Sequence, residues 1–164
     1  MGKYSLGISL ALVLVVSLCF AQTAGQKDSG HVMLTPKQIK WQAAPPSLPA
    51  GAQLAVLDGD PSQAGASYTI GLKMPDGYRL PPHWHPMDAS VTVIRGTFGM
   101  GLGEKFDPAQ GQELKPGSFM GVSKEVRHYE WTKGETVIYV SGLGPLDTTY
   151  VNPADDPRQK AQTK

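Results

Sequence analysis

The sequence predicts an all-β protein of one domain, built as a small sandwich or barrel. Its 164 residues suit one domain better than two. Glycine (19) and proline (14) are frequent, which suits short strands joined by turns and disfavours a helix bundle. Between residues 53 and 151, short runs of strand-forming residues alternate with turn signals, without helical periodicity. These observations together predict the fold class.

Nine short strands are expected in this region. Their expected ranges are 53–58, 67–74, 78–83, 89–95, 97–103, 117–122, 126–131, 135–143 and 148–151. Pro75-Asp76-Gly77 and Lys133-Gly134 are typical of the turns between them. Ahead of the strands, residues 43–51 contain three prolines and are expected to form an extended arm that lies on the barrel.

The N-terminus has the pattern of an export signal over residues 1–21. Lys3 precedes an uncharged, mostly apolar run over residues 6–20, and Cys19 and Ala21 supply small residues for a cleavage site. The run is shorter than the ~20 residues that span a bilayer, so cleavage is favoured over an uncleaved anchor. The mature chain is then expected in the periplasm or outside the cell.

Cleavage after Ala21 divides the rest into an N-terminal arm (22–50), a barrel domain (51–152) and a C-terminal tail (153–164). It removes Lys3 and leaves equal numbers of acidic and basic residues. That balance indicates neither nucleic acid nor a membrane surface as a partner. Cleavage also removes Cys19, the only cysteine, so the mature protein is expected to lack disulfides.

Three of the four histidines lie in the predicted strand region. His83 and His85 are two residues apart, so in a strand both imidazoles point to one face. His128 lies in a later strand that a barrel can bring alongside. Three imidazoles with open positions are typical of a reactive Zn, Cu, Fe or Ni site. The alternative is that His83 and His85 fill surface or core positions and that His128 is unrelated.

The surrounding glycines carry a resemblance to a known family. Gly77, His83, His85 and Gly96 have the spacing of the first motif of the cupin superfamily, and Gly117 lies 11 residues before His128, as in the second motif. The resemblance implies a single-domain cupin, a double-stranded β-helix or small jelly-roll barrel of the RmlC-like type. It also implies a divalent transition metal: Fe, Mn, Ni or Zn.

The sequence departs from the cupin pattern at the metal shell. Ala89 stands where the first motif has a ligating glutamate. In the second motif Ser123, Glu125 and Thr132 replace the usual proline, glycine and asparagine. Three interpretations remain: a metal held by three histidines and water, a substitute carboxylate, or a site that has lost its metal.

Glu130 is the preferred substitute carboxylate and the fourth predicted metal ligand. It lies two residues from His128, so strand alternation puts both side chains on one face. Asp88 is nearer in sequence to the missing position but has the wrong parity relative to His85, unless a bulge intervenes. The alternative for Glu130 is a solvent-exposed position at the mouth of the barrel.

Alternation also predicts parts of the pocket wall. Arg95 shares parity with the histidine pair and is expected to face inward, where it would meet an anionic substrate or an internal carboxylate. Trp84 and Tyr129 have the opposite parity and are expected to pack under the N-terminal arm. Before the second motif, either Phe119 or Met120 begins the inward set of its strand.

Two functions remain open at this point. The first is a metal-dependent, oxygenase-type enzyme that acts on a small organic molecule. The second is a non-catalytic cupin that binds or senses a small molecule or a metal. The segments Gly142-Leu143-Gly144-Pro145 and 150–158 are similar to the ending of small exported bacterial cupins. The resemblance further implies that two copies can pair as a homodimer.

Overall fold

The computed structural model describes residues 30–160, and the predicted signal segment lies outside these residues. Residues 32–160 belong to one compact unit. Within the described part of the chain, no helix combines the length and the apolar character needed to cross a bilayer.

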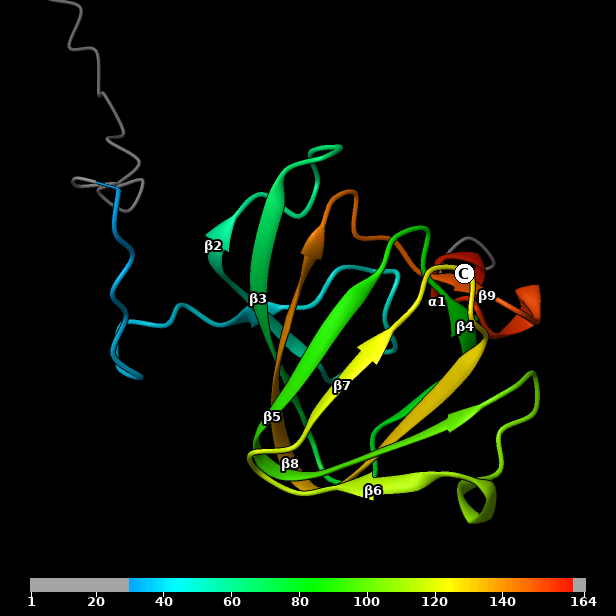
Figure 1. Cartoon of the computed structure of the whole chain (residues 1–164). Helices are drawn as coiled ribbons and strands as arrows, with labels where there is room; N and C mark the ends of the chain where they lie inside the picture. The colour runs from blue at the N-terminus through cyan, green and yellow to red at the C-terminus, as the bar shows by residue number, and fades with distance from the viewer. Residues whose placement is uncertain (1–29, 161–164) are drawn as a thin grey trace, which may run out of the picture. The chain divides into compact units, whose positions relative to one another are not determined.

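Nine strands form an antiparallel sheet that curls into a barrel (Figure 1), which confirms the predicted all-β class. The strands are β1 (Gln42–Ala43), β2 (Gln53–Gly59), β3 (Ser67–Met74), β4 (Arg79–Trp84), β5 (Ala89–Leu102), β6 (Gln112–Leu114), β7 (Phe119–Val122), β8 (His128–Leu143) and β9 (Thr149–Tyr150). Three short helices, η1 (Pro108–Gln110), η2 (Pro153–Asp155) and α1 (Pro157–Lys160), lie between or after them.

Two long bent strands hold the barrel together. β5 joins the strands expected at 89–95 and 97–103, and β8 joins those expected at 126–131 and 135–143. Gly96 (φ 81°) and Gly134 (φ 71°) lie inside them in the left-handed region that glycine adopts without strain. The glycines therefore bend the strands without ending them, and Lys133-Gly134 is an irregularity within β8, not a turn between strands.

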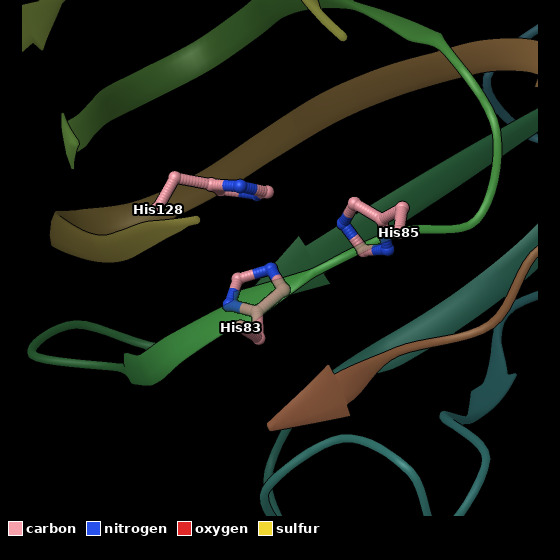
Figure 2. Close-up of side chains that lie close together, drawn as sticks. All are labelled: His83, His85 and His128. Carbon is pink, nitrogen blue, oxygen red and sulfur yellow. The ribbon is translucent and has the colours of Figure 1, made fainter. Parts of the chain in front are cut away.

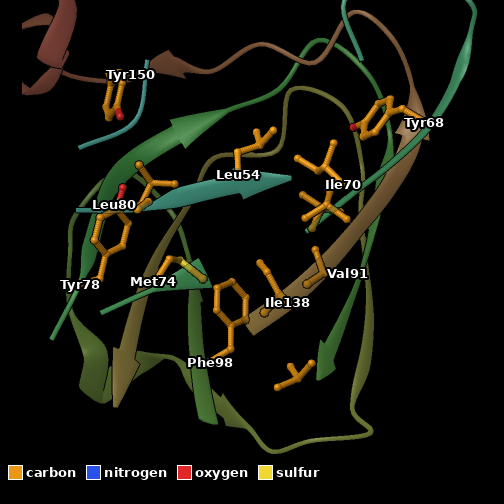
Figure 3. Close-up of a cluster of buried hydrophobic side chains, with 14 residues drawn as sticks. Leu54, Tyr68, Ile70, Met74, Tyr78, Leu80, Val91, Phe98, Ile138 and Tyr150 are labelled. Carbon is orange, nitrogen blue, oxygen red and sulfur yellow. The ribbon is translucent and has the colours of Figure 1, made fainter. Parts of the chain in front are cut away.

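The bends allow β5 and β8 to serve both halves of the barrel. Their 89–95 and 136–143 portions pair with each other and lie between β3 and β7. Their 97–102 and 128–133 portions pair with each other and lie between β4 and β6. Apolar side chains fill the space between the halves (Figure 3), with Phe98, Ile70, Ile138 and Val93 at most 1% exposed.

The arm ahead of β2 is attached to the barrel by specific contacts. Tyr78 Oη donates a hydrogen bond to the carbonyl oxygen of Pro49 (2.8 Å), and Tyr150 Oη donates to that of Ser47 (2.7 Å). Trp41 covers Gly71, where a Cβ atom would lie 2.9 Å from the indole ring. The arm thus holds its place through backbone acceptors and one large aromatic contact.

Arg95 does not face the interior, so that prediction is wrong. The register of β5 against β8 shifts between Val93 and Arg95, where two steps along β5 match one step along β8. This β-bulge reverses the alternation, because it inserts one unmatched residue, Ile94. Val93 is buried, whereas the Arg95 side chain is 60% exposed and forms an ion pair with Glu135.

Tyr129 points outward, as alternation predicts, but it is nearly fully buried there. Its ring stacks with Trp131 (ring centroids 6.1 Å apart) and contacts Phe106 (5.2 Å), and its Oη donates to the Asp107 carbonyl oxygen (2.6 Å). The cover that the structure shows is therefore the loop between β5 and β6, rather than the N-terminal arm. This cluster lies on the outer side of the strand segment that carries His128.

Candidate metal centre

The pairing of β4 with β8 brings His83 and His128 together. Leu80 is paired with Glu130, and His83 is paired with His128, so three steps along β4 match two along β8. The extra residue lies at Pro81-Pro82, where proline's missing N–H leaves the ladder incomplete and favours a bulge. Without this bulge the residue opposite His128 would be Pro82.

The three histidines form one cluster (Figure 2), with a ligand nitrogen from each lying within 4.8 Å of the others. The ring centroids of His83 and His128 are 4.2 Å apart, and His85 lies 4.9 Å from the first and 5.2 Å from the second. The side chains of His83 and His128 are fully buried. The convergence that strand alternation predicts is therefore present.

Each ring is oriented by a hydrogen bond from its Nδ1 to a backbone carbonyl oxygen. His83 Nδ1 bonds Pro81 O (2.8 Å), His128 Nδ1 bonds Val126 O (2.9 Å), and His85 Nδ1 bonds Asp147 O (2.7 Å). A carbonyl oxygen only accepts, so each Nδ1 carries the proton and each Nε2 of the neutral ring keeps a lone pair. A second contact of this kind is typical of metal-binding histidines.

Burial keeps the three rings neutral. It lowers the pKa of His128 to about 4, and it lowers the pKa of His83 well below its ordinary value, with further contributions from the neighbouring histidines. The pKa of His85 is also lowered by burial. Neutral imidazole is the form that binds a metal, so the site holds its rings in the ligating state.

Glu130 lies beside the histidines, on the same face of β8 as His128. Its Oε1 is 3.6 Å from His128 Nε2, too long for a hydrogen bond, and its side chain is only 11% exposed. Burial raises the pKa of Glu130 to about 8. The carboxyl group is therefore mostly protonated at neutral pH, and a cation bound between it and His128 Nε2 would favour its ionised, ligating form.

The orphaned ring nitrogens fit a metal ion. Among the described residues, His83 Nε2 and His128 Nε2 are the buried side-chain N or O atoms that have no hydrogen-bond partner. Leaving such atoms unpaired costs ~1–3 kcal/mol each, which a bound cation would offset. Two nitrogens bound to one ion at ~2.1 Å lie at most ~4.2 Å apart, so ion binding requires small ring movements from the present spread.

The positions of Asp88 and Ala89 show that neither supplies a carboxylate to the histidine cluster. Asp88 is exposed, and its Oδ1 accepts a hydrogen bond from the Lys124 backbone N–H (2.7 Å), so it serves a loop and not the histidine cluster. Ala89 lies in the wall of the cavity beside the histidines. Its methyl group offers no ligand atom to a metal.

Comparison with known proteins places the chain in a family. A family model described as "Domain of unknown function (DUF4437)" matches residues 24–149. The chain belongs to this family. None of the curated proteins compared with the chain matches it.

Solved structures show that the chain has the cupin fold. The polyketide cyclase RemF from Streptomyces resistomycificus aligns with a TM-score of 0.58 at 18% identity, covering 79% of this chain and 92% of that one. KdgF from Halomonas sp. aligns at 0.53 and 18%, covering 70% and 94%. An RmlC-like cupin from Shewanella frigidimarina aligns at 0.53 and 13%, covering 68% and 88%.

A cavity of about 80 Å³ adjoins the histidines of this cupin. His85, His128 and Glu130 form its polar end. The rest of its wall is mostly apolar and comes from both halves of the barrel and from the arm: Pro45, Leu48, Leu54, Ile70, Leu72, Leu80, Ala89, Val91, Val122, Ile138, Val140 and Leu146. The arrangement can bind a small molecule with one end near the three imidazoles.

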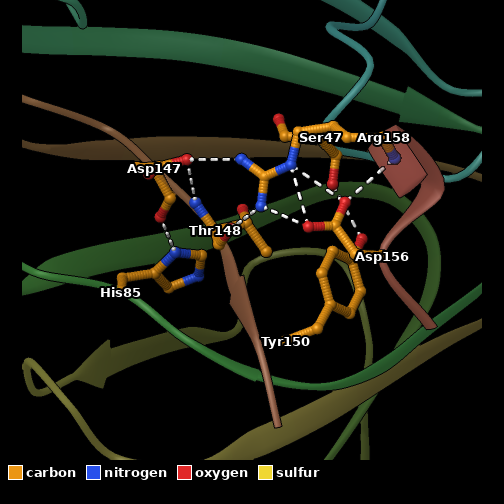
Figure 4. A network of polar contacts seen from close by, with 7 residues as sticks. All are labelled: Ser47, His85, Asp147, Thr148, Tyr150, Asp156 and Arg158. Carbon is orange, nitrogen blue, oxygen red and sulfur yellow. Dashed lines mark hydrogen bonds and ion pairs between the residues drawn. The ribbon is translucent and has the colours of Figure 1, made fainter. Parts of the chain in front are cut away.

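His85 depends on a distant part of the cupin, unlike the other two histidines. Its acceptor, Asp147 O, lies 62 residues away, whereas His83 and His128 bond carbonyls two residues before them. Arg158 holds the loop of Asp147: its guanidinium donates to Thr148 O (2.8 Å) and Asp147 Oδ1 (3.3 Å), and it pairs with Asp156 (Figure 4). The C-terminal segment is thereby tied to one member of the cluster.

Replacing Arg158 with glutamine is expected to loosen His85 alone. Without the guanidinium, Asp147 O is held less firmly and the ring of His85 populates both neutral tautomers. Imidazole ¹⁵N shifts in the metal-free protein should then converge for His85 and stay unchanged for His83 and His128. Equal changes in all three rings would contradict this role, and Arg127→Gln, which removes a surface pair with Glu104, is the matched control.

Sequence reasoning missed Asp147, Thr148 and Arg158. The contact that matters at Asp147 uses a backbone carbonyl, which every residue carries, so the residue type leaves no signal. The sole clue is that an acidic pair and an arginine follow one another at residues 155–158.

Proposed function

We propose that this chain is an exported, metal-dependent cupin that acts as an oxygenase-type enzyme on a small organic molecule. The observation that carries the proposal is the convergence of three neutral imidazoles, two with unpartnered Nε2 atoms, on the polar end of an apolar cavity. A site with three protein nitrogens leaves open coordination positions, and the cavity gives a substrate access to them.

His83, His85 and His128 hold the metal in this proposal, and Glu130 is the fourth ligand. A bound Fe, Mn, Ni or Zn ion supplies Lewis-acid or redox chemistry at the open positions. Glu130 is also a buried carboxylate beside the cluster, so its oxygen that is not bound to the metal can accept a proton leaving the substrate. The apolar wall excludes water from the bound molecule.

Glu130→Gln is expected to weaken metal binding by at least the ~10–100-fold seen when an outer partner of a metal ligand is lost, because it removes a direct ligand. The amide keeps the size of the side chain but removes the negative charge beside His128. The measurement is a metal titration of chelator-treated protein. Glu104→Gln, which changes a surface carboxylate paired with Arg127, should leave the affinity unchanged. Equal affinities of wild type and Glu130→Gln would remove Glu130 from the ligand set.

The function is tested by elemental analysis followed by oxygen uptake. Protein purified from its native compartment, with and without chelator treatment, is expected to carry about one transition-metal ion per chain. Oxygen consumption is then measured against a panel of phenols and small acids. Substrate-dependent uptake that chelator abolishes supports the enzyme. Metal and ligand binding without turnover would indicate the non-catalytic binder instead.

The export part of the proposal rests on residues 1–21 and has its own test. Mass spectrometry of the protein from its native compartment is expected to find Gln22 at the N-terminus. A chain that starts at Met1 in the cytoplasm would contradict export and leave the metal site untouched.

A further inference from the structure

We infer that the ligand of this cavity has one oxygen-donor end and an otherwise apolar, uncharged body of a few carbon atoms. The inference rests on the proposed function in one respect: the donor end faces the metal. The body is assigned from the cavity wall, which does not depend on the metal.

The polarity of the cavity is concentrated at one end. Among the described residues, the unpartnered buried side-chain N or O atoms are His128 Nε2, in the wall at this end, and His83 Nε2, in the same histidine cluster. The other polar residues in the wall are Ser47, Asp147 and Thr148. Asp147 O accepts from His85, and the carbonyl oxygens of Ser47 and Thr148 accept from Tyr150 and Arg158, which leaves the hydroxyls of Ser47 and Thr148 as the further side-chain partners for a ligand. Against the aliphatic remainder of the wall, hydroxyl or amino groups on the body of a ligand would be buried without partners, at a cost of ~1–3 kcal/mol each.

The lack of a cation in the cavity wall excludes a second ionised acidic group on the ligand. No lysine or arginine is found among the described residues that line it, and the Asp147 carboxylate is already paired with Arg158. A charge on the donor end can be balanced at the histidine cluster, but an anion farther along the body meets no cation. Diacids, amino acids and phosphorylated compounds are thereby disfavoured.

The cavity is also small. Its volume of about 80 Å³ is far below the ~300–1,000 Å³ of pockets that hold drug-sized ligands. Leu48 of the arm and Leu146 of the loop before β9 lie in its wall, so the arm and this loop limit the length of the ligand. A nucleotide or an oligosaccharide is too large for this space.

The test uses a homologous series of primary alcohols, from 1-propanol to 1-hexanol, with the full mature chain. Affinities are measured by ligand-observed NMR on metal-loaded and on chelator-treated protein, and metal content is determined in each sample. We expect binding to tighten about fourfold per methylene, the increment for burying one CH₂ group, until the cavity is full. Butane-1,2,4-triol and succinate, which share the four-carbon skeleton of 1-butanol, should bind at least tenfold more weakly.

Two variants identify the wall as the origin of the increment. Val140→Thr replaces a methyl of the wall by a hydroxyl and should reduce the gain per methylene. Val137→Thr makes the same change on the same strand, at a residue that is equally buried (8% exposed) but outside the cavity wall, and should keep the full gain. The matched pair separates an effect on the cavity from a general loss of stability.

The outcomes separate this inference from the proposed function. The assignment of the ligand would be overturned if affinity did not change along the alcohol series, or if the triol and succinate bound as tightly as 1-butanol, even in protein that carries its metal. The proposed function would be overturned if the protein bound no metal. In that case, a gain in affinity per methylene in the chelator-treated protein would still support an apolar body for the ligand.

Discussion

His128→Ala is expected to abolish stoichiometric metal binding. The substitution removes one of three converging nitrogens, so the loss should exceed the ~10–100-fold that follows from changing a supporting group. Wild-type protein should gain ~2.7 kcal/mol of unfolding free energy when the metal is present at 100 times its Kd, and the variant should gain none. Thermal unfolding with and without metal measures the difference.

The fourth histidine of the chain supplies the control for this experiment. His31 is exposed and lies ahead of the barrel, so His31→Ala should bind metal like the wild type. A second variant, His83→Leu, tests whether the cluster exists for packing. An apolar replacement removes the buried, unpartnered Nε2 but also the Nδ1 donor to Pro81 O, so the stability of metal-free protein should change by no more than ~1–3 kcal/mol. A loss of several kcal/mol, with metal binding intact, would indicate that the histidines are core residues.

Gly101→Ala is expected to destabilise the cupin by about 3 kcal/mol, the upper part of the usual range for overpacking, which lowers Tm by about 10 °C. Gly101 is paired with Tyr129 across β5 and β8, and the phenol ring lies directly over it. A Cβ atom at this position would lie 2.2 Å from the ring. Tyr129 cannot move aside without losing its hydrogen bond to Asp107 O and its stacking on Trp131.

The matched control is Gly121→Ala in β7. Gly121 is also a strand glycine, but it is exposed and an added Cβ would meet no atom within 4 Å. Its substitution should leave Tm unchanged or raise it slightly, because alanine reduces the freedom of the unfolded chain. If both substitutions had the same effect, the aromatic cover over Gly101 would not be what makes that position sensitive.

The consequence of this packing reaches the metal centre. Tyr129 and Trp131 alternate with His128 and Glu130 along one stretch of β8. The aromatic rings therefore pack on the outer side of the strand segment whose inner side carries the site. His83, His128 and Glu130 thus lie on strand residues, whose positions are better defined than those of loop residues, whereas His85 follows the end of β4 and depends on Asp147 O for its position.

Local chemistry was sufficient for the fold class and for the histidine cluster. Strand alternation follows from backbone geometry alone and predicted that His83 and His85 share a face. The two rings do converge, although β4 ends at Trp84 and His85 follows it. Glu130 lies on the face of His128 because of the same alternation. The cupin fold was implied by the resemblance of the glycine and histidine spacing to the two cupin motifs.

Only the tertiary structure decided where bulges interrupt the alternation of side chains along the strands. The bulge at Pro81-Pro82 sets His83 opposite His128, and the bulge after Val93 turns Arg95 outward to Glu135. Both depend on how two strands distant in sequence are aligned, and a single strand carries no record of its partner's register. The support of His85 by Asp147 O is likewise a contact over 62 residues to a backbone atom. The sequence therefore predicted which residue types share one face of a strand. The strand register and the backbone contacts that orient the histidine side chains form only in the folded barrel.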